Sequence, residues 1–237
     1  KRKIAVSYTP DAPAPAVADL TMGLMYSLLR KIHEANIQLH KGYWKKFIGT
    51  RLTDCSIGII GAGRIGTQVI NNLKALGCKQ ILYHDTKIHL KEENNNQVVF
   101  AEKEEIYAMS DIISLHVPLN LETKNMITLN EMKLMKKNVS LINTSRGGII
   151  NERDLYIALK DKLIAGAAID VFEHEPYTGK LLELENCILT SHMGPMSADC
   201  RIQMEKEATE EAVRFIMDNV QESPVPEEEY LLQNQSI

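Results

Sequence analysis

Six short apolar runs, rich in β-branched residues, recur along the chain and are separated by stretches in which apolar residues fall at helical spacing. The runs predict strands at about residues 55–63, 80–85, 111–118, 139–145, 165–172 and 186–192. The other stretches predict helices at about 64–76, 101–110, 128–137, 151–164 and 197–219. Because the strands are apolar on both faces and alternate with helices, the pattern predicts an α/β fold with a doubly wound parallel sheet.

The N-terminal region predicts one more strand and one long helix. Residues 3–8 have the composition of a strand. Residues 12–42 begin with turn-forming prolines and continue as a predicted helix. Its apolar residues fall near helical spacing, which indicates one buried face: Val17, Leu20, Leu24, Leu28 and Ile32.

Composition narrows the class of protein. The formal net charge is −4 and no basic cluster stands out, which argues against nucleic acid as the main partner. No apolar run is long enough to span a bilayer, so no membrane partner is expected. The four cysteines are scattered, with neither the paired spacing of a metal site nor the density of a disulfide scaffold. A reducing cytoplasm fits this pattern best, and no metal is expected.

A glycine motif follows the strand at 55–63 and opens the next helix. It reads GIIGAGRIG and contains Gly61, Gly63 and Gly66. Such a motif can be an ordinary tight turn, but its position between a strand and a helix favours a dinucleotide site of the Rossmann type. The first glycine permits the turn, the second lets backbone amides approach a pyrophosphate, and the third lets helix and strand pack closely. The helix N-terminus then attracts the phosphates.

Asp85 ends the next predicted strand, about 20 residues beyond the motif. A carboxylate there can accept hydrogen bonds from both ribose hydroxyls and would repel a 2′-phosphate, so NAD is favoured over NADP. A protonated His84 beside it would soften that repulsion. The alternative for Asp85 is a solvated turn residue.

Polar side chains follow the last three predicted strands. Arg146 follows the strand at 139–145, Asp170 and Glu175 lie at and beyond the next, and His192 ends the last. Ligands bind at this edge of open α/β sheets. A guanidinium binds a carboxylate through paired hydrogen bonds, an imidazole moves a proton, and a neighbouring carboxylate orients that imidazole. Beside a nicotinamide, these groups suit oxidation of a 2-hydroxy acid or reduction of a 2-keto acid.

Each of these three side chains also has an ordinary structural interpretation. Arg146 could be a partner within a glycine-rich turn, Glu175 a surface residue, and His192 a buried, inert histidine. Their common position at one predicted sheet edge favours the catalytic interpretation.

The chain resembles the D-isomer-specific 2-hydroxyacid dehydrogenases. The resemblance covers most of residues 9–217 and rests on five stretches in the family's order and spacing: GIIGAGRIG, SDIISLHVPLNLETKNMI, LINTSRGGIINERDLYIAL, GAAIDVFEHEP and LTSHMGP. It implies a Rossmann-type NAD-binding domain with remnants of a second, smaller, flavodoxin-like substrate domain. It also implies a homodimer, formed through the long helix that begins near residue 15.

The resemblance assigns site residues position by position. Arg146 corresponds to the substrate-carboxylate arginine, and His192 and Glu175 to the catalytic histidine and its partner. The implied NAD-binding residues are Gly61, Gly63, Arg64, Ile65, Gly66, Asp85, Val117, Pro118, Thr144, Ser145, Arg146, Asp170, His192 and Gly194.

The family's domain plan divides this chain unequally. Residues 1–10 correspond to the last strand of the substrate domain, 11–193 to the NAD-binding domain with its dimerisation helix, and 194–237 to a helix and tail that return to the substrate domain. The acidic tail is either an extended surface arm or a partly disordered terminus. The chain is shorter than members of the family, and the family's N-terminal region, which has no equivalent in this sequence, would precede residue 1. We therefore expect this chain alone to bind NAD but to turn over poorly, because half a cleft orients substrate badly.

The expected function is that of an NAD-dependent oxidoreductase that transfers a hydride between the nicotinamide and a small D-2-hydroxy acid or 2-keto acid. The alternative is a sensor or scaffold of the same fold, in which NAD(H) controls assembly without significant turnover. A third possibility is a relic fold that binds nothing. The sequence does not identify the 2-hydroxy acid.

Overall fold

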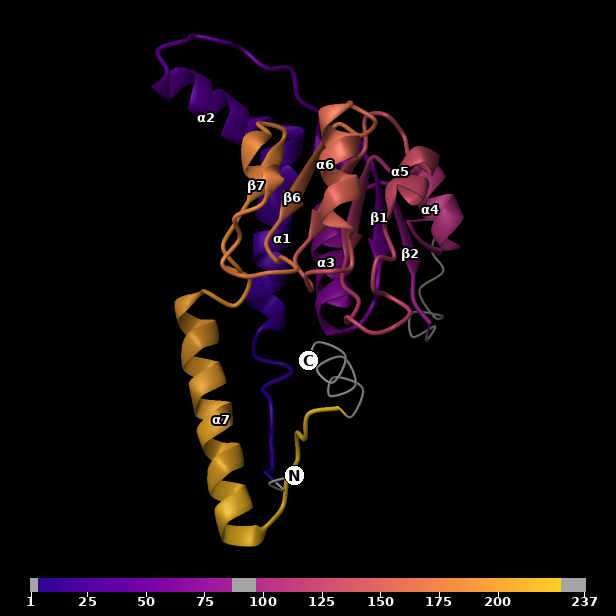
Figure 1. The fold of residues 1–237 in the computed structure, drawn as a ribbon. Helices are drawn as coiled ribbons and strands as arrows, with labels where there is room; N and C mark the ends of the chain where they lie inside the picture. Colours follow the sequence, from indigo (N-terminus) through magenta and orange to yellow (C-terminus); the bar gives the residue numbers. More distant parts are fainter. Residues whose placement is uncertain (1–3, 87–96, 227–237) are drawn as a thin grey trace.

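A seven-stranded sheet, parallel throughout, forms the centre of the protein (Figure 1). The computed structural model describes residues 4–86 and 97–226. Spatial order in the sheet is β3-β2-β1-β4-β5-β6-β7. The chain order reverses between β1 and β4, which is the switch point where open α/β sheets bind ligands. The strands are β1 (Ser56–Ile60), β2 (Gln80–His84), β3 (Val98–Phe100), β4 (Ile112–Leu115), β5 (Ser140–Asn143), β6 (Gly166–Ile169) and β7 (Cys187–Leu189).

Helices cover both faces of this sheet, which confirms the predicted doubly wound fold (Figure 1). Helices α1 (Ala14–Leu29) and α3 (Arg64–Ala75) lie on one face. Helices α4 (Lys103–Met109), α5 (Leu129–Leu134) and α6 (Glu152–Lys160) lie on the other. Helix α2 (Ile32–His40) and helix α7 (Ala198–Asp218) extend away from this body.

Two cores result from the alternation of side chains along the buried strands. Ile57 and Ile59 of β1 pack under α1 and α3, whereas Ile60 belongs to the core under α4, α5 and α6. Neighbouring β4 follows the same rule, with Ile112 in the first core and Ile113 in the second. Strands buried on both faces need apolar residues at every position, and this explains the continuous apolar runs in the sequence.

Strand β3 is one that the sequence pattern did not predict. It contributes three residues at the sheet edge, where Val98 pairs with Ile81 and Phe100 with Tyr83. A run this short carries too little alternation to be recognised from the sequence, so the prediction of six strands was wrong by one.

The prediction of one helix over residues 12–42 was also wrong. Helix α1 ends at Leu29, and α2 begins at Ile32 after Lys31 adopts a left-handed conformation with φ of 55°. The amide of Arg30 still bonds to the Tyr26 carbonyl, so the helix breaks within one residue. Helix α2 turns away from the sheet and has no buried residue (Figure 1).

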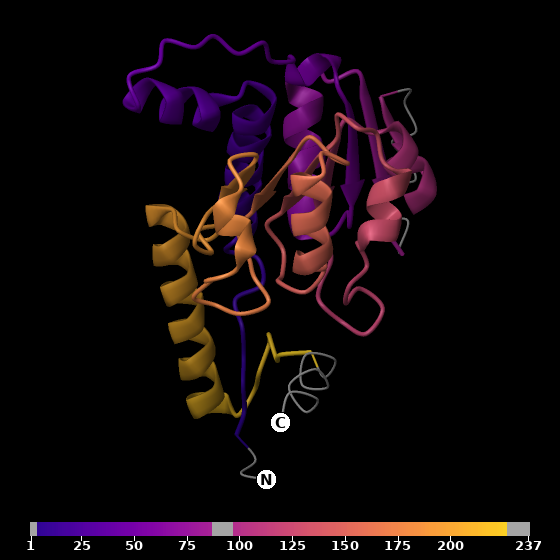
Figure 2. The same ribbon diagram turned by 45° about the horizontal axis from the view of Figure 1, so that its top comes forward.

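The strand expected at residues 3–8 is not formed in the part that the structure describes. Residues 4–8 contain only an isolated antiparallel bridge between Ser7 and Pro224. The amide of Tyr8 donates to the Ser223 carbonyl, and the amide of Val225 donates to the Val6 carbonyl. The segment therefore lies beside the chain that follows α7, apart from the seven-stranded sheet (Figure 2).

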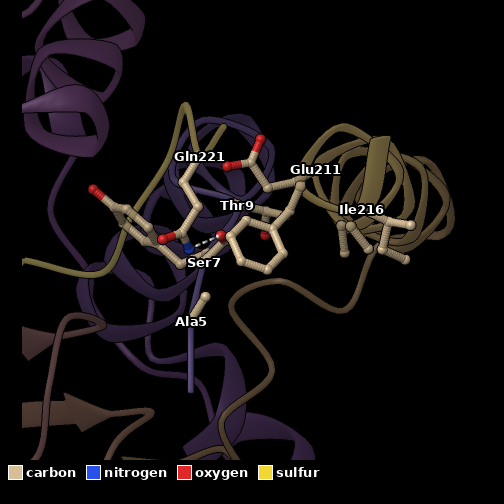
Figure 3. Close-up of a pocket in the computed structure, with 10 residues that line it drawn as sticks. Ala5, Ser7, Thr9, Glu211, Ile216 and Gln221 are labelled. Carbon is tan, nitrogen blue, oxygen red and sulfur yellow. Dashed lines mark hydrogen bonds between the residues drawn. The ribbon is translucent and has the colours of Figure 1, made fainter. Parts of the chain in front are cut away.

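A cavity of about 330 Å³ separates this N-terminal segment from α7. Figure 3 shows Ala5, Ser7 and Thr9 on one side of it and Glu211 and Ile216 of α7 on the other. Among the described residues, no helix is both long and apolar enough to cross a membrane.

Candidate functional site

The glycine motif forms a tight turn between β1 and α3. Gly61 has a φ of +96°, a conformation that side chains rarely adopt, and its amide donates to the His84 carbonyl. A Cβ at Gly66 would lie 1.9 Å from the Gly61 carbonyl oxygen, so helix and turn can approach only without it. A Cβ at Gly63 would meet no atom within 4 Å. That open space, at the start of α3, is where a pyrophosphate would approach the free amides of the first helical turn.

Asp85 lies directly after β2 and is tied to the same turn. Its Oδ2 accepts a 2.7 Å hydrogen bond from the amide of Ala62. The carboxylate is therefore held against the glycine motif, in the position expected of a ribose partner. The neighbouring His84 has its Nδ1 3.2 Å from the Ala101 carbonyl oxygen.

A cavity of about 340 Å³ opens in front of α3, at the carboxyl ends of β4 and β5. Six of the sequence-predicted residues line it: Arg64, Ile65, Val117, Pro118, Ser145 and Arg146. Its lining contains two guanidinium groups and no carboxylate, a charge distribution that suits a diphosphate. With Asp85 and the open face of Gly63, the residues present fit a dinucleotide.

His116 lines the same cavity and had no role in the sequence prediction. Its Nε2 lies 2.9 Å from Ser114 Oγ, while its buried Nδ1 has no hydrogen-bond partner in the described chain. Desolvation lowers the pKa of His116 to about 4, so the ring is neutral near neutrality. The sequence signal that could have identified His116 is its position at the end of the apolar run 112–115.

Arg146 sits in a short loop that Asn143 fixes at the end of β5. The Asn143 side chain donates to the Arg146 carbonyl and accepts hydrogen bonds from Ser145. A Cβ at Gly147 would lie 1.9 Å from the Phe172 carbonyl oxygen, so this loop packs closely against the chain after β6. Asn143 is not among the site residues that the sequence predicts.

His192 and Glu175 form the central pair of the site. His192 Nδ1 lies 2.9 Å from Glu175 Oε2, and the other carboxylate oxygen accepts a hydrogen bond from the Phe172 amide. Both side chains remain substantially exposed, at 45% and 39%. Partial desolvation raises the pKa of Glu175, but the hydrogen bonds from His192 and Phe172 and the charges of His192 and Arg146 outweigh it, so the pKa is lowered overall. The pair is thus ionised on the carboxylate side and accessible on the imidazole side.

Asp170 holds the loop that carries His192. This carboxylate is fully buried and accepts hydrogen bonds from Thr190 Oγ1 and from the amides of Met193 and Gly194. The His192 amide donates to the Asp170 carbonyl, and His192 itself is left-handed, with φ of 53°. The backbone and side chain of Asp170 thus hold the His192 loop in a sparsely populated backbone conformation. Asp170 and Gly194 therefore position His192.

Thr144 lies behind the Arg146 loop and is buried. Thr21 of α1 donates to the Val17 carbonyl, so the 2.9 Å contact between the Thr144 and Thr21 hydroxyls takes its hydrogen from Thr144. This bond ties α1 to the end of β5, directly beneath the site.

A second cavity, of about 600 Å³, lies on the Glu175 side of the pair. Its walls are mainly apolar and include the stacked rings of Phe172 and Tyr177, together with Leu182 and Leu189. Within the described residues, no group of His, Cys, Asp or Glu side chains is arranged to hold a metal ion.

Residues 22–194 match the NAD binding domain of the D-isomer specific 2-hydroxyacid dehydrogenases. The chain belongs to this family. Over 225 residues it is 39% identical to a glyoxylate reductase of Thermococcus litoralis, a match that covers 91% of this chain and 68% of the relative. It is 40% identical over 204 residues to a D-3-phosphoglycerate dehydrogenase of Methanocaldococcus jannaschii, covering 85% of this chain and 39% of that protein.

The family's solved structures share the fold. The NAD-complexed D-isomer specific 2-hydroxyacid dehydrogenase of Lactobacillus delbrueckii ssp. bulgaricus superposes with a TM-score of 0.84 at 27% identity, covering 95% of this chain and 74% of that one. The family match confirms the sequence prediction that the cofactor is NAD. Both curated relatives are longer than the part they share with this chain.

Proposed function

We propose that the protein is an NAD-dependent oxidoreductase that interconverts a small D-2-hydroxy acid and its 2-keto acid. One observation carries the proposal: the exposed His192–Glu175 pair, whose carboxylate feels the charge of Arg146, lies at the edge of an NAD-binding domain. Imidazole, carboxylate and guanidinium are the three groups that this reaction requires from the protein.

Each of these side chains has one role in the proposed reaction. Arg146 binds the substrate carboxylate, which fixes the reacting carbon relative to the ring of the cofactor. In the reducing direction, His192 donates a proton from Nε2 to the carbonyl oxygen. Glu175 holds Nδ1, so that Nε2 faces the substrate, and stabilises the charged imidazolium. The bound nicotinamide would supply the hydride as NADH in reduction and accept it as NAD⁺ in oxidation.

Cofactor recognition is proposed to follow the cavity in front of α3. Gly63 leaves room for the pyrophosphate, Arg64 and Ile65 cover it, and Asp85 binds the adenosine ribose. Val117, Pro118 and Ser145 line this cavity and would continue the path to the nicotinamide, with the buried Thr144 behind them.

We further propose that residues 1–10 and 194–237 belong to a second domain and residues 11–193 to the first. Two observations support this division. The N-terminal segment bonds to the chain after α7 and stays outside the sheet. Helix α7 also exposes large apolar side chains, among them Ile202 at 69% and Ile216 at 78%, which a further layer of protein would cover.

A homodimer is proposed to form through α2 and the stretch that follows it. Helix α2 buries none of its residues, and the next residues expose an unusual amount of apolar surface. Tyr43 is 63% exposed, Trp44 83% and Ile48 99%. A second copy of the chain would cover these side chains.

The decisive assay measures NADH oxidation by the full-length protein with glyoxylate, hydroxypyruvate, pyruvate, phosphohydroxypyruvate and longer 2-keto acids. The proposal predicts turnover with at least one of them and identifies the substrate class by the highest kcat/KM. Tight NADH binding with no turnover on any 2-keto acid would favour the sensor or scaffold instead. No NADH binding would leave only a relic fold. The same assay on residues 1–237 tests the expectation that this chain binds NADH but turns over poorly.

A further inference from the structure

An ion pair joins the proposed pyrophosphate site to the segment before α1. Arg64 is the first residue of α3, and its Nε donates to Asp11 Oδ1 across 53 positions of sequence. Both side chains are largely exposed, at 56% and 73%. An exposed pair of this kind contributes little to folding stability.

The bond occupies only one end of the guanidinium. Arg64 presents five N–H donors, and Asp11 takes the one on Nε. In the described chain, no protein group accepts a hydrogen bond from the two terminal nitrogens. Because the guanidinium is planar and rigid, fixing Nε also fixes the direction of the terminal nitrogens. Arg64 lines the cavity of about 340 Å³ in front of α3, so these donors are available to an anion there.

Asp11 is itself held in place by the backbone. Its carbonyl accepts a hydrogen bond from the Ala14 amide at the start of α1, and the adjacent Pro10 lines the same cavity. Helix α1 in turn packs beside α3 in one core. The backbone of Asp11 is therefore tied to the start of α1, which packs against the helix that follows the glycine motif.

We infer that Asp11 is a positioning residue for the cofactor, which holds Arg64 so that its terminal nitrogens meet the pyrophosphate. The inference rests on the proposed cofactor site. Asp11 touches no cofactor atom in this account. It acts by pre-ordering a long side chain that would otherwise lose its freedom when the dinucleotide binds.

Titration of NADH, followed by nicotinamide fluorescence on the chain of 237 residues, tests this inference. Asp11→Ala is expected to raise the Kd for NADH about three- to tenfold, the cost of ordering one rotamer-rich side chain. Asp11→Asn keeps an oxygen acceptor for Nε and should retain most of the affinity. Asp19→Ala, which removes an exposed carboxylate from α1, is the matched control and should leave the Kd unchanged.

The background variant Arg64→Ala makes the test specific. There Asp11→Ala should have no further effect, because the side chain that it positions is gone. An equal loss with and without Arg64 would overturn the inference, and so would an Asp11→Ala protein that binds NADH as tightly as the wild type. Tighter binding by both Asp11 variants would also overturn it, since the carboxylate would then compete with the pyrophosphate. If the wild type binds no NADH, the proposed cofactor site fails as well.

Discussion

Glu175 is fixed from two sides, by the imidazole of His192 and by the Phe172 amide. Loss of hydration is the largest single effect and raises the pKa of Glu175, but these two hydrogen bonds together with the charges of His192 and Arg146 outweigh it and lower the pKa overall. The carboxylate therefore stays ionised to a lower pH than an ordinary glutamate does. The interaction between ionised Glu175 and His192 is fully present above the ordinary glutamate pKa. It is lost as the pH falls through the lowered pKa of Glu175.

Replacing Glu175 with Gln should lower kcat on the order of 10²-fold, because the uncharged amide neither orients nor stabilises the imidazolium. The same change should move the acid-favoured limb of keto-acid reduction to lower pH. Steady-state pH profiles of the reduction measure both effects. Glu173→Gln, two residues away and exposed, is the control and should match the wild type. An unchanged profile in the Glu175 variant would contradict the proposed role.

His116 provides a prediction about stability. It is neutral in the folded chain down to about pH 4, whereas an unfolded histidine binds a proton near pH 6.5. Its folded pKa is depressed, so its contribution is present above pH 6.5 and is lost as the pH falls towards 4. His116→Gln should therefore reduce the loss of unfolding free energy between pH 7 and pH 4.5 by about 2 kcal/mol.

Urea unfolding at the two pH values measures this difference. His40→Gln serves as the control, because His40 is exposed and its replacement should not alter the pH dependence. Identical pH dependence in wild type and His116→Gln would show that the buried imidazole does not titrate as described.

At the scale of the element, two glycines in the turn from β1 to α3 have different roles: Gly66 allows close packing, and Gly63 leaves space for the pyrophosphate. Gly66→Ala would place a methyl group 1.9 Å from a backbone oxygen that cannot move aside, so the variant should lose much of its thermal stability. Gly63 has an ordinary φ of −73° and open space in front of it. Gly63→Ala should fold normally, yet bind NADH at least about tenfold more weakly, because the methyl group fills the approach of the pyrophosphate.

Thermal melts and NADH titrations of the two variants separate these effects. A Gly63→Ala protein with wild-type Tm and wild-type affinity would show that the pyrophosphate does not approach this turn.

Some of the helices, strands and turns could be predicted from the sequence and others could not. The buried strands, the glycine turn and the polar residues at strand ends were predictable, because each reflects a local pattern. The break at Lys31 was not, since helical spacing continues through it and neither glycine nor proline marks it. The roles of Asn143 and Asp170 as supports were also hidden, because each depends on partners that only the fold brings close. Which strand ends lie next to each other depends on the order of the strands in the sheet, and only the structure gives that order.

At the scale of the whole molecule, the exposed apolar stretch after α2 is the surface that we propose a second copy of the chain covers. Trp44→Asp combined with Ile48→Asp should convert a dimer into a monomer, since both side chains would otherwise be buried between two copies. Sedimentation velocity measures the change. Leu121→Asp, at a site that is 63% exposed elsewhere on the surface, is the control and should leave the dimer intact. A wild-type chain that sediments as a monomer at micromolar concentration would contradict this assignment.

The central claim is that His192 moves the proton while other residues hold the cofactor. It is tested most directly by comparing the wild type and His192→Ala in the full-length protein, with turnover and NADH binding measured on the same samples. The account predicts that kcat for the best 2-keto acid falls at least about 100-fold while the Kd for NADH stays within a few-fold. Turnover that survives the loss of His192, in a variant that still binds NADH, would contradict it.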